Sequence, residues 1–447
     1  MPRWQRAALS LMAATLALLG AAGCMATQGS RDAAAGETRP ASSGERGAPA
    51  DGNAPSLAPA DSSVRTVQLY AGKDERRLPV LALGAEDEDL TLEFDLMARE
   101  GRPLSVYFYH AGQNWERDAA PARFLDSFRS DDLLNFSSAR ARGVPYVHYT
   151  YRFPNRDVGF KASGNYILRV TEQGEEEEVL FERPFFVAEQ TGALELRLDE
   201  LRRGTQAGLS DRPVARYRIP PALDRSPFNF SACFVPDARL RQARCVERPE
   251  GGGSGRPLTF ELPYRESFAP GTEQFFLDLS RLDPGAEIAD VRRGRTPPEV
   301  ILETDYADFA GAGRAPVVGR QPVVRGAGIV GADPALSAEY AAVRFRFVPP
   351  GERKLRGPLV LAGSFDAGDL GGAPRLRWNP DRGRYEGRVL LKQGLYTYRY
   401  ASPDPALRRA LAQSRRPARR RYAAFVYYRD ATLGTDRLLR VRRTEAP

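Results

Sequence analysis

Short segments in which apolar and polar residues alternate are the feature that most limits the fold of this chain. In residues 90–96, four apolar residues alternate with three polar ones, which is the period-two pattern of a strand with one buried face. Similar segments recur along the chain, which is also rich in turn-forming residues, with 41 Gly and 35 Pro. Short strands between turn residues are typical of sandwiches. The sequence therefore predicts an all-β protein of tandem immunoglobulin-like or β-sandwich domains.

The N-terminal segment indicates export. Arg3 and Arg6 precede an uncharged apolar run, Ala7–Leu19, and small residues then lead to Cys24. The run is shorter than the about 20 residues that a permanent membrane helix needs, and its basic start and small-residue end are typical of a secretion signal. The arrangement resembles a bacterial lipoprotein signal, in which the cysteine is acylated. Residues 1–23 would then be the signal peptide, with Cys24 lipidated; a cleaved soluble signal and a retained anchor are the alternatives.

Composition divides the rest of the chain. Residues 24–63 are rich in Ala, Gly, Ser and Pro without hydrophobic periodicity, so we expect a disordered tether. Three β domains follow, with expected bounds of 64–189, 190–335 and 336–447. In the last of these, residues 385–391 and 395–400 are expected to form a hairpin, with Tyr396, Tyr398 and Tyr400 on one face.

Two cysteines remain once Cys24 is set aside. Cys233 and Cys245 flank a segment that is expected to be strand, turn and strand. In an oxidising compartment such a pair is a disulfide candidate. Two separate buried thiols are the alternative.

No catalytic or metal-binding pattern stands out in the sequence. Only two histidines occur, His110 and His148, and both fall on predicted strands, where packed structural roles are expected. We therefore expect no enzyme, no metal, no cofactor and no small-molecule substrate. The formal charge of +8 is too small to indicate nucleic-acid binding. The main basic cluster is a candidate contact for an anionic partner, and the alternative is an exposed loop; its arginines are Arg415, Arg416, Arg419, Arg420 and Arg421.

Several ordered motifs in residues 64–189 resemble the N-terminal domain of the type IX secretion system plug protein family. They include Val64–Tyr70, Tyr109–His110 followed by Trp115, Val144–Tyr149, and Phe160–Tyr166. The family-motif residues that carry the resemblance are His110, Trp115, His148, Pro154, Asn155, Gly164, Asn165 and Tyr166.

The resemblance implies a non-catalytic periplasmic plug or accessory subunit. Its partner would be the large outer-membrane β-barrel translocon, and it would sit in the cell envelope as an outer-membrane lipoprotein whose body faces the periplasm. Leu361–Phe365 is also similar to early-set immunoglobulin-like domains that bind glycogen. A lipid-anchored envelope protein that binds glycan or another polyanion is therefore the alternative function.

Overall fold

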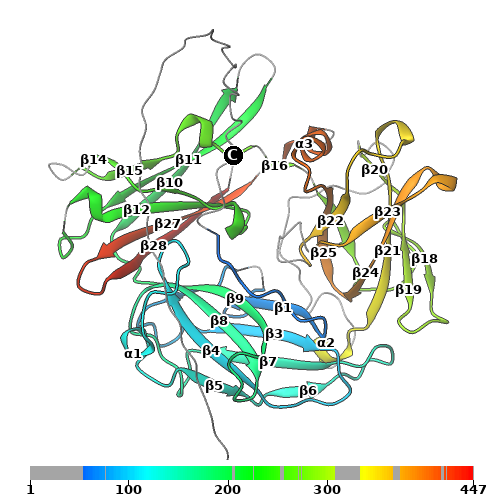
Figure 1. Cartoon of the computed structure of the whole chain (residues 1–447), viewed down its shortest axis with the longest axis horizontal. Coiled ribbons are helices and arrows are strands. Elements are labelled where there is room, and N and C mark those ends of the chain that lie inside the picture. The colour runs from blue at the N-terminus through cyan, green and yellow to red at the C-terminus, as the bar shows by residue number, and fades with distance from the viewer. Residues whose placement is uncertain are drawn as a thin grey trace, which may run out of the picture. The chain divides into compact units, whose positions relative to one another are not determined.

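The computed structural model describes residues 54–445 except 76, 204–206, 225, 252–255, 270, 273, 308–332, 366–372, 414–416 and 419. Strands dominate these residues (Figure 1), so the all-β prediction is confirmed. The described helices are short: α1 (Pro121–Phe124), α2 (Pro334–Ser337) and α3 (Pro405–Gln413).

Two sheets form a first sandwich within the predicted domain 64–189. One has the order β1 (Val64–Ala71), β3 (Leu90–Leu96), β7 (Val147–Phe153) and β6 (Phe136–Ser138). The other has the order β2 (Val80–Ala82), β9 (Val179–Ala188), β8 (Gly164–Glu172), β4 (Leu104–Ala111) and β5 (Ser130–Leu133). Their core is aromatic: Phe94 stacks on Tyr149, and Phe108 packs against Phe153. Such aromatic pairs contribute about 0.5–1.5 kcal/mol beyond the area that they bury.

Two further sheets enclose a second core. One is ordered β10 (Ala193–Arg203), β11 (Ala207–Arg218), β15 (Leu258–Glu261) and β14 (Glu250–Gly251). The other is ordered β13 (Arg244–Val246), β12 (Phe230–Pro236), β27 (Arg421–Asp430) and β28 (Thr435–Glu445). Cys233 and Cys245 lie opposite each other on β12 and β13 and are joined in a disulfide.

A nine-stranded sheet surrounds the third core. Its path is β17 (Phe275–Asp278), β25 (Leu395–Ala401), β22 (Leu359–Gly363), β23 (Arg375–Asn379), β24 (Arg384–Lys392), β21 (Tyr340–Val348), β19 (Glu299–Leu302) and β18 (Ile288–Arg292), with β20 (Asp305–Tyr306) on β21. The three tyrosines of β25 are buried in this core, as the alternation predicted. A small separate pair joins β16 (Gly271–Thr272) to β26 (Pro417–Ala418).

Strand pairing crosses the boundary that was expected near residue 335. Strand β12 pairs with β27, and β17 pairs with β25. Both sheets therefore combine strands from the two expected segments 190–335 and 336–447. The expected bounds followed from local sequence patterns, which report local backbone preference and carry no information on which distant strands pair.

The hairpin expected at residues 385–400 is also absent from the pairing of the described strands. Strand β24 pairs with β21 and β23, whereas β25 pairs with β17 and β22. The Lys392-Gln393-Gly394 segment does reverse the chain, but the two strands that it joins lie apart in the sheet order. A turn signal fixes a local change of direction, and the choice of partner strand depends on long-range packing.

Candidate functional site

A buried polar group that we call the Asp95 cluster connects the first sandwich to the nine-stranded sheet. It consists of Asp95 on β3, His148 on β7, Tyr340 on β21 and Lys392 at the end of β24. Asp95 and His148 are cross-strand neighbours, and so are Tyr340 and Lys392. Two strand pairs from different sheets thus bring their polar side chains to one point.

Asp95 is the centre of this cluster. One carboxylate oxygen lies 2.8 Å from His148 Nδ1, and the other accepts hydrogen bonds of 2.7 Å from the Tyr340 hydroxyl and from Lys392 Nζ. Asp95 is fully buried, and Lys392 is 2% exposed. The ammonium also lies 4.3 Å from the centre of the Tyr146 ring, a cation–π contact. Every charge in the cluster therefore has a partner, which burial of a charge requires.

The surroundings shift the pKa values of two groups in opposite directions. Burial alone would raise the pKa of Asp95, but the Lys392 charge and the His148 hydrogen bond hold it below the ordinary value of 3.8. Burial alone would lower the pKa of His148, but hydrogen bonds to Asp95 and Glu93 raise it above 6.5. Both shifts favour the charged forms, so the cluster is an ion pair across the contact between the two sheets.

The signs of these shifts define a pH window. The contribution of His148 to stability is complete below pH 6.5 and is lost as the pH rises through its higher folded-state pKa. The contribution of Asp95 is complete above pH 3.8 and is lost as the pH falls through its lower folded-state pKa.

We therefore expect His148→Gln to lower the free energy of unfolding by about 1.5–3 kcal/mol at pH 5, the value of a charge-assisted hydrogen bond, and by less at pH 9. Denaturant unfolding of both proteins at the two pH values measures this. A difference in unfolding free energy that is equal at the two pH values, or larger at pH 9, would contradict a charged His148 paired with Asp95.

A second polar group, the His110 cluster, lies where the first sandwich meets β28. It comprises His110 on β4, Asp118, Ser163 and Thr435 on β28. His110 Nδ1 lies 2.7 Å from an Asp118 carboxylate oxygen, and Nε2 lies 3.1 Å from the Ser163 carbonyl oxygen. The Thr435 hydroxyl donates to the other Asp118 oxygen. Burial opposes ionisation of Asp118, but these two side-chain hydrogen bonds lower its pKa below the ordinary value.

Neighbouring contacts extend the same junction. The Tyr427 hydroxyl of β27 donates to Asn165 Oδ1 at 2.8 Å, and Arg437 of β28 forms a two-armed ion pair with Glu189 at 2.7 and 2.8 Å. The Phe186 ring packs on Phe425, with ring centres 4.6 Å apart. Trp115 in turn packs edge-on against Phe186. Polar and apolar contacts therefore both join this face of the first sandwich to β27 and β28.

Four of the eight family-motif residues thus lie at the two junctions. His110, Trp115 and Asn165 face β27 and β28, and His148 faces the nine-stranded sheet. Gly164 supports His110, because a Cβ atom at position 164 would overlap the imidazole ring. Tyr166 lies in the sandwich core, stacked on Phe185.

Pro154 and Asn155 close the turn after β7. The Phe153–Pro154 peptide bond is cis. Asn155 Oδ1 accepts hydrogen bonds from the backbone N–H groups of Asp157 and Val158 at 2.8 and 2.9 Å. These two motif residues therefore shape a loop and take no part in either junction.

The basic cluster is placed only in part. Arg415, Arg416 and Arg419 lie outside the described residues, as does Cys24. Arg420 differs from the exposed contact that was expected: it is 7% exposed, and its guanidinium donates to Asp237, Gln242 and the Ala269 carbonyl oxygen. Arg421 follows it on β27 and is half-buried. The arginine count alone could not show that Arg420 is used internally.

Membrane-spanning helices and metal sites are two further kinds of functional feature to consider among the described residues. None of their helices has the length and apolarity needed to cross a membrane. No three His, Cys, Asp or Glu side chains among them gather in a metal-binding arrangement.

Comparison with known proteins gives one family and one fold. Residues 64–189 match the family model described as "Type 9 secretion system plug protein 1st domain". No curated protein matches the chain. A crystal structure of a hypothetical protein from Parabacteroides merdae ATCC 43184 superposes with a TM-score of 0.75 at 20% sequence identity, covering 87% of this chain and 99% of that one. At this identity, the likeness concerns the fold alone.

Proposed function

Because residues 64–189 are a first domain of the type 9 secretion system plug protein family, we propose that this chain is a non-catalytic subunit that binds the periplasmic end of the outer-membrane translocon and closes it. The family match gives the chain a role associated with type 9 secretion and a place in the cell envelope. We propose the large outer-membrane β-barrel of that system as its docking partner.

One observation supports a stopper in particular. Motif residues of the first domain lie in buried contacts with the rest of the chain: His148 through Asp95 to Lys392, and Asn165 to Tyr427. Paired buried charges tolerate little displacement, because separating them leaves a desolvated charge without a partner. The described sheets would then act as one rigid body. A rigid body can close a wide pore by shape, and docking becomes a matter of complementary surfaces.

Affinity purification tests this function. The protein, tagged at its C-terminus and expressed at its natural level, should recover a large outer-membrane β-barrel from detergent-solubilised membranes. Residues 1–63 fused to an unrelated soluble protein provide the matched control, since they carry the signal and tether without the body. Recovery of the barrel by the control alone, or by neither protein, would refute the proposal.

We further propose that Cys24 carries a lipid and that residues 25–63 tether the body to the membrane. A tether raises the local concentration at a membrane partner without adding any contact. Cys24→Ser should therefore move most of the protein from the membrane fraction to the soluble periplasm. Full membrane retention of this variant would show that docking alone localises the protein.

A further inference from the structure

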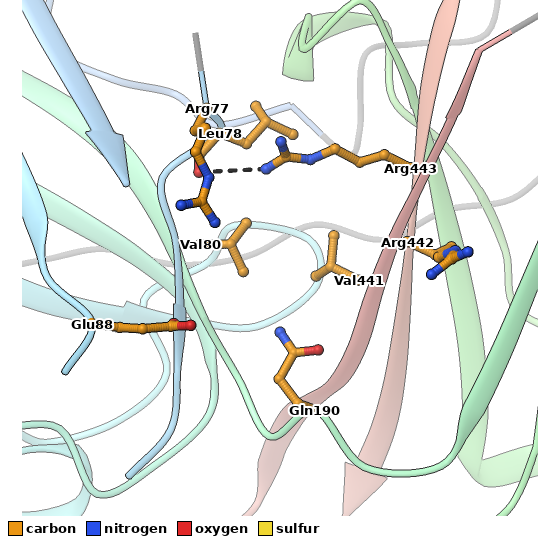
Figure 2. A pocket seen from close by; sticks show the side chains of 8 residues that line it. All are labelled: Arg77, Leu78, Val80, Glu88, Gln190, Val441, Arg442 and Arg443. Carbon is orange, nitrogen blue, oxygen red and sulfur yellow. Dashed lines mark hydrogen bonds between the residues drawn. The ribbon is translucent and has the colours of Figure 1, made fainter. Parts of the chain in front are cut away.

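A pocket of about 320 Å³ lies between the edge of the first sandwich and strand β28 (Figure 2). Eight residues line it: Arg77, Leu78, Val80, Glu88, Gln190, Val441, Arg442 and Arg443. Its volume falls at the lower end of the range for small-ligand sites, about 300–1,000 Å³. It is therefore large enough for a small molecule or the headgroup of a larger one.

Positive charge is in excess around this pocket. Three arginines line it against one carboxylate, that of Glu88. Arg77 and Arg443 reach it from different segments, and Arg443 contacts the Leu78 carbonyl oxygen at 3.5 Å (Figure 2). Burial lowers the pKa of Arg443, and the nearby charges of Arg77 and Arg421 lower it further, against a smaller opposing effect of Asp74. An anion placed here would relieve this repulsion.

The remaining lining is mixed. Leu78, Val80 and Val441 provide an apolar wall and belong to the hydrophobic cluster beneath the pocket. The Gln190 side chain points into the space from the segment after β9 (Figure 2). An amide can donate a hydrogen bond to an oxyanion. Two guanidinium groups that come from different directions suit a tetrahedral phosphate, whose several oxygens can accept from both, better than a planar carboxylate.

We propose that this pocket binds a phosphate group carried on a short carbon chain, with Arg77 and Arg443 on the phosphate and the side chains of Leu78, Val80 and Val441 against the carbon atoms. Free glycerol phosphate and the headgroup of an anionic glycerophospholipid share this chemistry. The site does not depend on the proposed secretion role, because it is tested with purified protein and defined ligands.

Two isosteric substitutions change the charge of the pocket in opposite directions. Gln190→Glu adds a second carboxylate to the pocket lining and should weaken binding of glycerol 3-phosphate at least tenfold. Glu88→Gln removes the carboxylate, keeps an oxygen that can accept from the Ala82 N–H, and should tighten binding several-fold. Arg443→Gln should weaken binding at least tenfold. Arg156→Gln, on a side chain that is 93% exposed, removes the same charge elsewhere and should have no effect.

Isothermal titration calorimetry at low salt measures these affinities, and thermal unfolding checks that each variant is folded. Absence of glycerol 3-phosphate binding, or equal binding by all four variants, would overturn the site. Butyrate binding as tight as that of glycerol 3-phosphate would overturn the phosphate assignment. Because both isosteric variants keep the side-chain volume, opposite changes in affinity cannot arise from misfolding.

Sedimentation with vesicles distinguishes the two sources of the phosphate group, free glycerol phosphate and a lipid headgroup. Protein carrying Cys24→Ser, so that no lipid on Cys24 contributes, is sedimented with phosphatidylcholine vesicles with or without phosphatidylglycerol. Binding that needs phosphatidylglycerol and is weakened by Gln190→Glu supports a lipid headgroup. Binding of glycerol 3-phosphate without vesicle binding supports a free phosphate ligand.

Discussion

Asp95→Ala is expected to lower the free energy of unfolding by about 3–5 kcal/mol, the cost of breaking a buried ion pair by removing one partner. The substitution leaves the Lys392 ammonium, 2% exposed, without its carboxylate. It also removes the partner of His148 Nδ1 and one of the two hydrogen-bond partners of the Tyr340 hydroxyl, the other being the Thr66 hydroxyl. Among the described residues, Asp95 is the carboxylate within ion-pair distance of Lys392, so the lost interaction has no ready substitute.

Denaturant unfolding followed by circular dichroism measures the effect of Asp95→Ala. Asp87→Ala, at an exposed position just before β3, should change stability by no more than about 0.5 kcal/mol. Adding Lys392→Met should recover part of the loss, because it removes the uncompensated charge and keeps an unbranched side chain. An Asp95→Ala effect no larger than that of Asp87→Ala would contradict the burial and pairing described for the cluster.

Gly164→Ala is expected to lower the free energy of unfolding by about 2–4 kcal/mol, the sum of a backbone and a packing cost. Gly164 has a φ of 154°, in a region that residues with a Cβ atom rarely adopt. The added Cβ would also overlap the His110 ring. His110 is 1% exposed and held at both nitrogens, so it cannot move away without losing a hydrogen bond.

Gly174→Ala is the matched control for this prediction. Gly174 has a φ of 77° at the tip between β8 and β9, and nothing lies within 4 Å of a Cβ built there. Gly174→Ala should therefore lower the free energy of unfolding only through the backbone conformation, by about 1 kcal/mol. Thermal unfolding of both variants separates the two costs. Equal losses for the two variants would show that contact with His110 is unimportant.

Local sequence patterns were sufficient for some of these features. Alternation located β3 and its apolar face, and the spacing of Cys233 and Cys245 suggested a strand pair that the structure joins by a disulfide. These features depend on residues that are close in sequence. The burial of Tyr396, Tyr398 and Tyr400 likewise follows from their common face on one strand.

The Asp95 cluster could not be predicted in the same way. The alternation in residues 90–96 suggested that Glu93 and Asp95 face water, whereas they are 2% and 0% exposed. Alternation shows that the two faces of a strand differ in polarity and does not show what covers the polar face. Here a second sheet covers it and supplies Tyr340 and Lys392. The available sequence signal was weak: Asp95 and His148 each lie among apolar or aromatic residues on separate predicted strands.

The pairing of β12 with β27 also has a consequence for the order in which the protein assembles. Phe230 lies opposite Tyr428, which follows it by about 200 residues in the sequence. A chain that leaves a ribosome or crosses a membrane from its N-terminus exposes β12 long before its partner arrives. The first sandwich uses only earlier residues and can form at once, whereas the second core must wait, with an unpaired strand edge that is prone to aggregation. Completion of the second core therefore has to follow the synthesis or export of β27 and β28.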